Sequence, residues 1–278
     1  KLHKGIGVKH LVLQGRKFML TFSNAKSDMF DRVCMATGSM KSSTLAKSIE
    51  GLGHTIEPLA PSLFALDIAD ERLKELAGIS LKNVSVRVKS KGKSQAGPIL
   101  ITHRGLSGPA ILKLSAWEAR QLNELDYKFD IELNWLGLRT ESDLKALFAR
   151  IRNQKGQQLL KTKLFDEMPR RLWEKILSYV KIKETLQWAQ LPKKMEFQLI
   201  KELISASFPV YGKTMNKEEF VTCGGVSLKE VNFKNMESRL IPNLHFAGEC
   251  LDYDGVTGGF NFQGAWTTGH IAGKSMAG

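Results

Sequence analysis

The chain has 278 residues and carries 41 lysines and arginines against 28 aspartates and glutamates, a formal net charge of +13. It is long enough to form two domains with sizeable cores. It contains no apolar run that could span a bilayer, no apolar signal-peptide core near its N-terminus and no Cys/His cluster with metal-ligand spacing. These features argue against a membrane protein or a zinc protein, and three widely spaced cysteines predict reduced thiols and a cytoplasmic location.

The positive charge is unevenly distributed along the chain. Residues 1–100 and 150–201 each carry a net charge of +8, whereas residues 101–149 and 202–278 carry −1 and −2. Such a surplus attracts polyanions such as RNA through the release of counterions. It is also typical of a solvated, lysine-rich surface. Composition therefore leaves RNA binding open as one of two interpretations.

The N-terminal segment predicts a β-hairpin followed by a strand, a turn and a helix. Val8–Leu13 and Lys17–Phe22 alternate between apolar and polar residues, as paired strands do. Phe30–Ala36 is a short apolar run that is typical of a buried parallel strand. The Thr-Gly-Ser sequence at 37–39 ends this strand, and Ser43–Leu52 has the pattern of a helix.

The next segment predicts a small antiparallel β module. Pro58 and Pro61 indicate a crossing between domains. Val84–Val88 and Tyr127–Trp135 alternate cleanly between apolar and polar residues, and Ile99–Thr102 predicts a further strand.

A glycine-flanked loop precedes a helix predicted at Ser107–Arg120. His103 supplies a titratable imidazole and Arg104 a guanidinium, so both are candidate catalytic residues that would face a cofactor or an anionic substrate. Alternatively, Ser107 caps the helix and His103 satisfies a neighbouring carbonyl. Pro109 is compatible with the first helical turn, where a missing N–H costs little.

Residues 141–207 have the periodicity of a basic helical bundle. Apolar residues recur on one face, as at Leu144 and Phe148. Trp173 and Trp188 lie among lysines and arginines, a combination that can bind RNA by stacking and phosphate contacts. Such tryptophans are more often core anchors of a small bundle, which is the interpretation we favour.

Val221–Val226 predicts a strand that returns the chain to its first domain. Gly224 and Gly225 would permit a close approach between backbones. Cys223 has no CxxC partner, so it is expected to be a packed, inert cysteine rather than a redox thiol.

The C-terminal segment has the strongest functional pattern. Leu244–Ala247 predicts a buried strand, and Gly264–Ala277 predicts a helix of small residues. Between them, Gly255, Gly258 and Gly259 would let backbone N–H groups approach a ligand near a positively polarised helix start. This order suits the pyrophosphate and polar chain of a dinucleotide, although a glycine-rich turn without a ligand has the same pattern.

Four motifs, in the same order along the chain, resemble those of one family. They are ATGS at Ala36–Ser39 with LGHTIEPLAPSLFAL at Leu52–Leu66, THRGLSGPAILKLS at Thr102–Ser115, VTCGGVSLKEV with MESRLIPNLHFAGE within Val221–Glu249, and AGECLDYDGVTGGFNFQGAWTTGHIAG from Ala247. The chain resembles the BaiN/YhiN-type flavoproteins, the aminoacetone oxidase-family FAD-binding enzymes.

The resemblance implies an α/β fold, α+β overall. Its parts would be a partial doubly wound, Rossmann-like FAD-binding domain, an inserted antiparallel β module and a small helical bundle. It implies FAD as cofactor, with NAD(P)H as a candidate electron donor. The implied cofactor-binding residues are Ala36, Thr37, Gly38, Gly248, Glu249, Gly255, Thr257, Gly258, Gly259, Phe260 and Asn261. His103 and Arg104 are the candidate catalytic residues.

The chain departs from the family at its N-terminus, where members carry a G-x-G-x-x-G strand–turn–helix unit for the ADP pyrophosphate. No such fingerprint is present. We therefore expect a fragment that starts after that unit and lacks the adenine half of the site. The expected organisation is 1–60 and 208–278 for the FAD-binding domain, 61–140 for the β module and 141–207 for the helical subdomain.

Two functional hypotheses follow. The first is a flavin-dependent oxidoreductase, or a part of one, that transfers hydride through FAD to a small molecule or to a nucleobase in RNA. The second is an RNA- or ribosome-binding module that no longer uses flavin. A yellow preparation would favour the first hypothesis, and a colourless protein with salt-sensitive RNA binding would favour the second.

Overall fold

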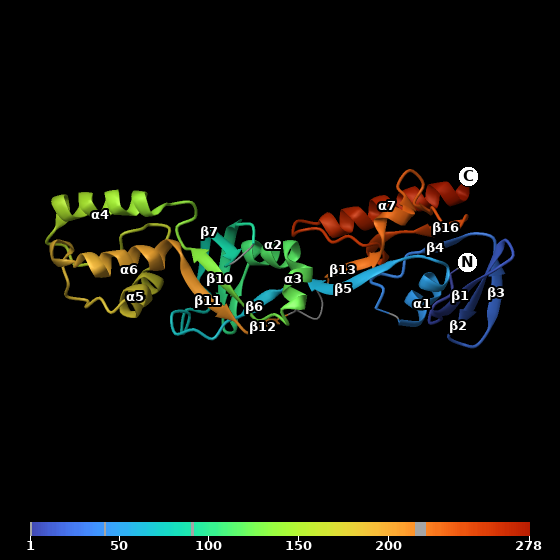
Figure 1. Ribbon diagram of the computed structural model, residues 1–278, viewed down its shortest axis with the longest axis horizontal. Helices are drawn as coiled ribbons and strands as arrows, with labels where there is room; N and C mark the ends of the chain where they lie inside the picture. Colours follow the sequence, from blue (N-terminus) through green and yellow to red (C-terminus); the bar gives the residue numbers. More distant parts are fainter. Residues whose placement is uncertain (1, 42, 90–91, 215–220) are drawn as a thin grey trace. The chain divides into compact units, whose positions relative to one another are not determined.

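The computed structural model describes residues 2–41, 43–89, 92–214 and 221–278, and the chain divides into two compact units (Figure 1). Unit 1 comprises Lys1–Ser62 and Phe220–Gly278, and unit 2 comprises Leu63–Glu219. Each unit has its own hydrophobic core. The mixed helix and strand content confirms the predicted fold class. None of the described helices is long and apolar enough to cross a membrane.

A three-stranded antiparallel sheet begins unit 1. It contains β1 (Val8–Gln14), β2 (Lys17–Phe22) and β3 (Ser27–Phe30), in that order. The predicted hairpin is confirmed, and Leu11 and Phe18 anchor it in the core of unit 1. The sequence analysis missed β3 because its residues are mostly exposed and show no apolar alternation.

The second sheet of unit 1 holds the parallel strands of the fold. Its order is β14 (Val231–Asn232), β15 (Glu237–Ser238), β16 (Leu244–Phe246) and β4 (Val33–Met35), with β16 and β4 parallel. The buried parallel strand predicted at Phe30–Ala36 is therefore present as β4, which is shorter than expected. Helix α1 (Ser43–Gly51) follows β4 as predicted.

A two-stranded antiparallel ribbon pairs β5 (Ile56–Ser62) with β13 (Val221–Val226). The two prolines of β5 hid this strand from the sequence analysis, because proline normally interrupts a ladder and is tolerated on edge strands or at bulges. The ladder is irregular between Cys223 and Gly225. A Cβ on Gly224 would lie 2.3 Å from the carbonyl oxygen of Pro58, which confirms the predicted close approach between backbones.

Helix α7 (Phe260–Ala277) closes unit 1 and begins four residues earlier than predicted. Gly259 precedes it in the left-handed conformation, with φ of 85°. Glycine adopts this conformation without the steric cost that a Cβ would impose, so the glycine sets the point at which the helix begins.

The strands in the described part of unit 2 form an antiparallel sheet of seven members. Its order is β11 (Ala206–Val210), β10 (Phe129–Asn134), β7 (Ser80–Val88), β8 (Gln95–Thr102), β9 (Gly105–Ser107), β6 (Ala65–Asp67) and β12 (Gly212–Thr214). The two outermost strands, β11 and β12, are separated in sequence by Tyr211 alone. The continuous segment 206–214 thus pairs with β10 through β11 and with β6 through β12. Because this segment supplies both edge strands, the sheet closes into a barrel.

The helix predicted at Ser107–Arg120 is divided into α2 (Pro109–Trp117) and α3 (Ala119–Glu124). Pro109 occupies the first helical position, as expected. The predicted cap at Ser107 is wrong, because Ser107 belongs to β9 and Gly108, with φ of 98°, precedes the helix without a side-chain cap. A Cβ on Gly108 would lie 2.9 Å from the backbone of Ile99, so the chain passes too closely here for a larger residue.

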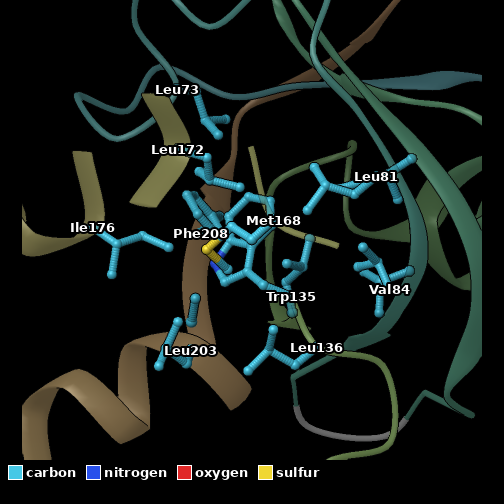
Figure 2. Close-up of a cluster of buried hydrophobic side chains, with 14 of the residues drawn as sticks. Leu73, Leu81, Val84, Trp135, Leu136, Met168, Leu172, Ile176, Leu203 and Phe208 are labelled. Carbon is cyan, nitrogen blue, oxygen red and sulfur yellow. The ribbon is translucent and has the colours of Figure 1, made fainter. Parts of the chain in front are cut away.

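The helical part of unit 2 consists of α4 (Glu141–Lys155), α5 (Arg170–Tyr179), a 3₁₀ turn (Trp188–Gln190) and α6 (Lys193–Ile204). Its side chains share one core with the barrel. Figure 2 shows Leu172 and Ile176 of α5 and Leu203 of α6 lying around Trp135 and Phe208. Trp135 and Phe208 meet edge to face, with ring centroids 5.8 Å apart.

Trp173 and Trp188 are buried, with exposed fractions of 0% and 1%. The interpretation of these tryptophans as core anchors is therefore confirmed, and RNA stacking on them is excluded.

The barrel also shifts the boundary between the units. Residues 206–214 pair with β10 and β6, so they belong to unit 2, whereas the sequence analysis assigned residues from 208 onward to the FAD-binding domain. The physical reason is the alternation of Ala206, Phe208 and Val210, whose side chains fill the core of unit 2.

Candidate functional site

Two sequence motifs meet at one edge of the parallel strand pair in unit 1. Leu244 pairs with Val33 and Phe246 with Met35, and the Ala247 N–H donates to the Met35 carbonyl at 2.9 Å. Because parallel strands end at the same edge, the segment 36–38 after β4 lies beside the segment 248–249 after β16. In open α/β sheets, ligands bind in the crevice outside the carboxyl ends of the strands.

Each of these two segments turns at a glycine, and the first of them is accessible. Gly38 and Gly248 have φ of 71° and 75°, a conformation that favours glycine. A Cβ on Gly38 would meet no described atom within 4 Å. Ala36 and Thr37 are exposed, so this segment faces open space.

Thr268 of α7 fixes the second segment. Its hydroxyl accepts a hydrogen bond from the Gly248 N–H at 2.9 Å and donates one to the Gly264 carbonyl at 2.7 Å. Thr268 thereby holds the turn after β16 against the helix. Sequence reasoning missed this residue because the contact spans 20 positions and no local pattern reveals it.

Three buried hydroxyls of unit 1 have no hydrogen-bond partner among the described residues. They are Ser39 Oγ, directly after the Gly38 turn, Thr222 Oγ1 of β13, and Tyr253 Oη of the C-terminal loop. An unsatisfied buried polar group costs about 1–3 kcal/mol. With the glycine turns, these hydroxyls fit a bound group that offers polar partners, as the ribityl chain and phosphates of FAD do.

The acidic side chains of the C-terminal loop bind other parts of unit 1. Glu249 Oε1 accepts from the Thr222 N–H at 3.0 Å, and Asp254 Oδ2 accepts from the Ser62 hydroxyl at 2.5 Å. These bonds tie the loop to both strands of the β5–β13 ribbon. Each carboxylate uses one oxygen for its bond, and the other oxygen does not bond to Thr222 or to Ser62.

The start of α7 combines a side-chain clasp with open backbone groups. The Asn261 side chain accepts from the Gly255 N–H at 2.7 Å and donates to the Gly255 carbonyl at 3.0 Å. The Asn261 side chain therefore holds the loop that precedes α7. Gly258 has φ of 117° and, like Gly259, is exposed. The first N–H groups of a helix lack intrahelical partners, so the segment 257–260 offers backbone donors to a ligand.

The predicted catalytic loop lies in unit 2, where it lines a cavity of about 590 Å³. Thr102, His103, Arg104 and Gly105 contribute one side of it. The remaining lining residues are Ile68, Ala69, Asp70, Glu71, Leu73, Lys74, Glu75, Ala77, Arg171 and Tyr211. The structure thus places both candidate catalytic residues at a concave surface.

Arg104 is oriented by a buried carboxylate. Arg104 Nη2 lies 2.7 Å from Asp67 Oδ2, and the Thr214 hydroxyl donates to the other oxygen of Asp67. Asp67 is 3% exposed, whereas the side chain of Arg104 is 64% exposed. Asp67 therefore anchors an arginine that lines the cavity. The only sequence signal for Asp67 was an acid at the end of an apolar run, which did not single it out.

The backbone of this loop is held locally. Thr102 Oγ1 accepts from the N–H groups of Arg104 and Gly105, at 3.3 and 3.1 Å. A Cβ on Gly105 would lie 2.2 Å from the Leu66 carbonyl oxygen, so only glycine fits against β6. His103 is exposed, and its ring makes no hydrogen bond within the described ranges. The alternative in which His103 satisfies a carbonyl is therefore wrong.

The cavity lining carries charges of both signs. Lys74 pairs with Glu71, and Arg171 donates to the backbone carbonyl of Glu75. Burial acts to raise the pKa of Asp70, but hydrogen bonds from Arg72 outweigh it and lower that pKa, so the carboxylate stays ionised near neutral pH. In the described part of the chain, no cluster of His, Cys, Asp and Glu side chains could hold a metal ion.

The thiols do not form a redox site. Cys34 and Cys250 are free thiols, and burial raises the pKa of each, to about 12 for Cys250. Cys223 is buried, with an exposed fraction of 7%. A thiol must ionise to act as a nucleophile, so the raised pKa disfavours a nucleophilic role for Cys34 and Cys250.

Comparison with known proteins identifies relatives across most of the chain. Residues 60–221 match the family model described as the HI0933-like protein barrel and H2TH domain. This region covers the whole of unit 2 and agrees with its closed sheet and helices.

Three curated proteins are similar to the chain. The ribosomal RNA dihydrouridine synthase of Escherichia coli is 29% identical over 248 residues, covering 86% of this chain and 58% of that protein. The 3-dehydro-bile acid delta(4,6)-reductase of Clostridium scindens is 25% identical over 285 residues, covering 100% and 69%. The ribosomal RNA dihydrouridine synthase of Haemophilus influenzae is 30% identical over 231 residues, covering 82% and 54%. The chain thus spans between about half and two thirds of these relatives' lengths.

Proposed function

The chain belongs to the HI0933-like family of FAD-dependent oxidoreductases, and from this premise we propose that it is part of a flavin-dependent reductase that acts on a nucleobase in RNA. The family assignment confirms the resemblance that the four sequence motifs indicated. The reaction, the substrate and the electron donor are proposals that build on it.

One observation carries the proposal for the cofactor. The parallel pairing of β4 with β16 places the turn at Gly38 beside the turn at Gly248, and the start of α7 follows in the same unit. The proposed FAD contacts are backbone groups of these three segments, supplemented by the hydroxyl of Ser39. Helix N-termini and glycine turns stabilise negative charge on phosphates and on a reduced flavin.

Bound FAD would supply hydride, which no side chain of the protein can provide. The protein's own contribution would come from the cavity of unit 2. Arg104, anchored by Asp67, would position a substrate carbonyl or phosphate through its free donors. His103, whose exposed imidazole lines the same cavity, would donate the proton that accompanies hydride addition.

The names of the relatives support a reduction. Two are named for forming dihydrouridine in ribosomal RNA, and one is named a reductase of a bile acid. Dihydrouridine is uridine that has gained two hydrogen atoms. The proposed reaction adds a hydride and a proton across a ring double bond of uracil, with NAD(P)H as the proposed source of the electrons.

The direct test is to purify the protein, record its visible absorbance and incubate it with unmodified ribosomal RNA and NADPH. Digestion to nucleosides followed by mass spectrometry would detect dihydrouridine. A yellow protein that forms dihydrouridine is the expected result. A colourless protein that binds RNA in a salt-sensitive manner would instead favour a binding module without flavin chemistry.

A matched pair of variants tests the proposed cofactor site. Thr268→Val removes the hydroxyl that holds Gly248 and is expected to lower the fraction of protein that retains FAD. Thr267→Val changes the neighbouring exposed residue, whose hydroxyl bonds only to Gln263 among the described residues, and should leave FAD content unchanged. Equal FAD content in both variants would contradict the assignment.

A further inference from the structure

We infer that the solvent-facing side of α6 binds single-stranded RNA, with a base stacked on Phe197 and phosphates held by Lys193, Lys194 and Lys201. This inference rests on the proposed RNA substrate and names the surface that would grip it. The four residues are referred to below as the α6 face.

The α6 face follows from helical spacing. Lys193, Phe197 and Lys201 are separated by four residues each, so their side chains lie in one row along the helix. Lys194 is three residues before Phe197 and lies beside it. The opposite side of α6 carries Leu199, Ile200 and Leu203, which are buried in the core of unit 2, and the α6 face is exposed.

Phe197 is not among the described residues that form or pack against the core of unit 2. Its exposed fraction is 54%, whereas Phe148, Phe165 and Phe208 of the same unit are buried to 3% exposure or less. An exposed phenyl ring offers a flat surface on which a nucleobase can stack. Three lysines around one ring distinguish this residue from an isolated apolar side chain on a surface.

Two of the three lysines, Lys193 and Lys194, are also unexplained by the fold, whereas Lys201 lies in the last turn of α6, where the helix dipole favours positive charge. No ion pair of Lys193, Lys194 or Lys201 occurs among the described residues, although other cations of the helical part, such as Arg152 and Arg170, have carboxylate partners. Lys193 and Lys194 lie in the first turn of α6, where the helix dipole disfavours positive charge. Their position therefore costs helix stability, which an anionic ligand would offset.

The composition of the α6 face favours RNA over a protein partner. Lysine is depleted in the cores of protein–protein interfaces, where aromatic residues are surrounded by apolar ones. Aromatic rings interleaved with cations are instead the pattern of single-strand binding, because the rings stack on bases and the cations neutralise phosphates. The surrounding segment 150–201, with its net charge of +8, would attract the RNA over a longer range.

The test measures the binding of a short fluorescent single-stranded RNA by anisotropy at several KCl concentrations. Phe197→Ala should weaken binding about 5- to 150-fold, because stacking contributes about 1–3 kcal/mol per base, and should leave the salt dependence unchanged. The triple variant K193Q/K194Q/K201Q should reduce the slope of log K against log[salt] by about 2, since each phosphate contact to a single strand contributes about 0.7.

The chain offers matched controls in unit 1. Phe233 is exposed to 52%, close to the value for Phe197, so Phe233→Ala removes an equally accessible ring. The triple variant K229Q/K234Q/K274Q removes the same charge from exposed lysines. Both controls should bind RNA as the unaltered protein does, and both should retain its content of flavin.

Three outcomes would overturn the inference. In the first, Phe197→Ala binds RNA as tightly as the unaltered protein. In the second, the two triple lysine variants reduce the slope of log K against log[salt] equally. In the third, the affinity for heparin, which has no bases, falls as much as the affinity for RNA when Phe197 is replaced. RNA binding and dihydrouridine formation that survive loss of the α6 face would refute this inference alone. Reduction of a small molecule by a protein that binds no RNA would refute the proposed RNA substrate as well.

Discussion

His54 and Glu230 are joined by a hydrogen bond of 3.0 Å between Nδ1 and Oε2, and the imidazole is completely buried. The other ring nitrogen lies 2.8 Å from the hydroxyl of Ser238. Ser238 Oγ also accepts from the N–H of Ile241 at 2.8 Å, and Glu230 accepts from the N–H of Thr55 at 2.8 Å. One histidine thus links the turn after α1 to the strands that lead into β16.

The protonation of this network makes stability depend on pH. Burial lowers the pKa of His54 and outweighs the opposing effect of Glu230, so the imidazole is neutral near pH 7. Burial acts to raise the pKa of Glu230, but hydrogen bonds from Thr55 and His54 lower it, so the carboxylate is ionised. In this arrangement, Nδ1–H donates to Glu230 and Nε2 accepts from the Ser238 hydroxyl.

We predict that the free energy of unfolding falls as the pH drops below about 6.5, the ordinary pKa of histidine in an unfolded chain. The unfolded chain then binds a proton that the folded protein resists, and stability continues to fall toward the lower pKa of folded His54. Urea unfolding at pH 7.5 and pH 5.5 measures the effect. His54→Ala should lose about 1–3 kcal/mol at the higher pH and show a smaller drop on acidification. His10→Ala, at an exposed position, is the control.

The Asp67–Arg104 pair predicts a positioning effect on activity. Asp67→Asn removes the charge that orients Arg104, so kcat/KM of the flavin-loaded enzyme should fall about 10- to 100-fold. Glu132→Gln removes the acid of the solvent-exposed pair with Arg87 and should have little effect. Steady-state kinetics with saturating reductant would compare them, and equal activities would refute a role for Arg104.

His103 is predicted to act as a proton donor. Replacement by Ala should lower turnover about 10²- to 10⁴-fold, the range for loss of a general acid, without emptying the flavin site. His103 belongs to unit 2 and the proposed flavin contacts to unit 1, so absorbance and turnover should separate. Unchanged turnover in flavin-loaded protein would reject this role.

Replacement by alanine is predicted to have opposite effects on stability at two glycines of α7. A Cβ on Gly264 would lie 2.6 Å from the hydroxyl oxygen of Tyr253, whereas a Cβ on Gly269 would meet no described atom within 4 Å. Gly264→Ala should therefore destabilise unit 1 by about 1–3 kcal/mol. Gly269→Ala should stabilise the helix by about 0.5–1 kcal/mol. Urea unfolding of both variants provides the comparison, and adding Tyr253→Ala to Gly264→Ala should recover part of the loss.

Local sequence patterns identified many elements of the fold. The β1–β2 hairpin and the barrel strands that contain Val84–Val88 alternate strongly enough to be recognised. The β3 and β5 strands escaped recognition, since one is largely exposed and the other contains two prolines. Their pairing depends on neighbours that the local pattern does not specify.

The residues of the candidate site divide in the same way into those that a local sequence pattern reveals and those that only a distant contact reveals. Motifs in the sequence pointed to the segments 36–38, 248–261 and 102–105. Asp67, Thr268 and the α6 face were not identified, because each acquires its meaning from a contact or an exposure that only folding creates.

The amino-acid order by itself determined the family, the glycine-rich turns and the charge of the helical segment, because these depend on residue types at short spacing. Tertiary structure alone decided that β4 lies beside β16, that Asp67 orients Arg104 and that Phe197 is exposed while Trp173 is buried. The reason is physical: pairing across 211 positions, as between Val33 and Leu244, depends on how cores close, and burial is a property of the packed chain.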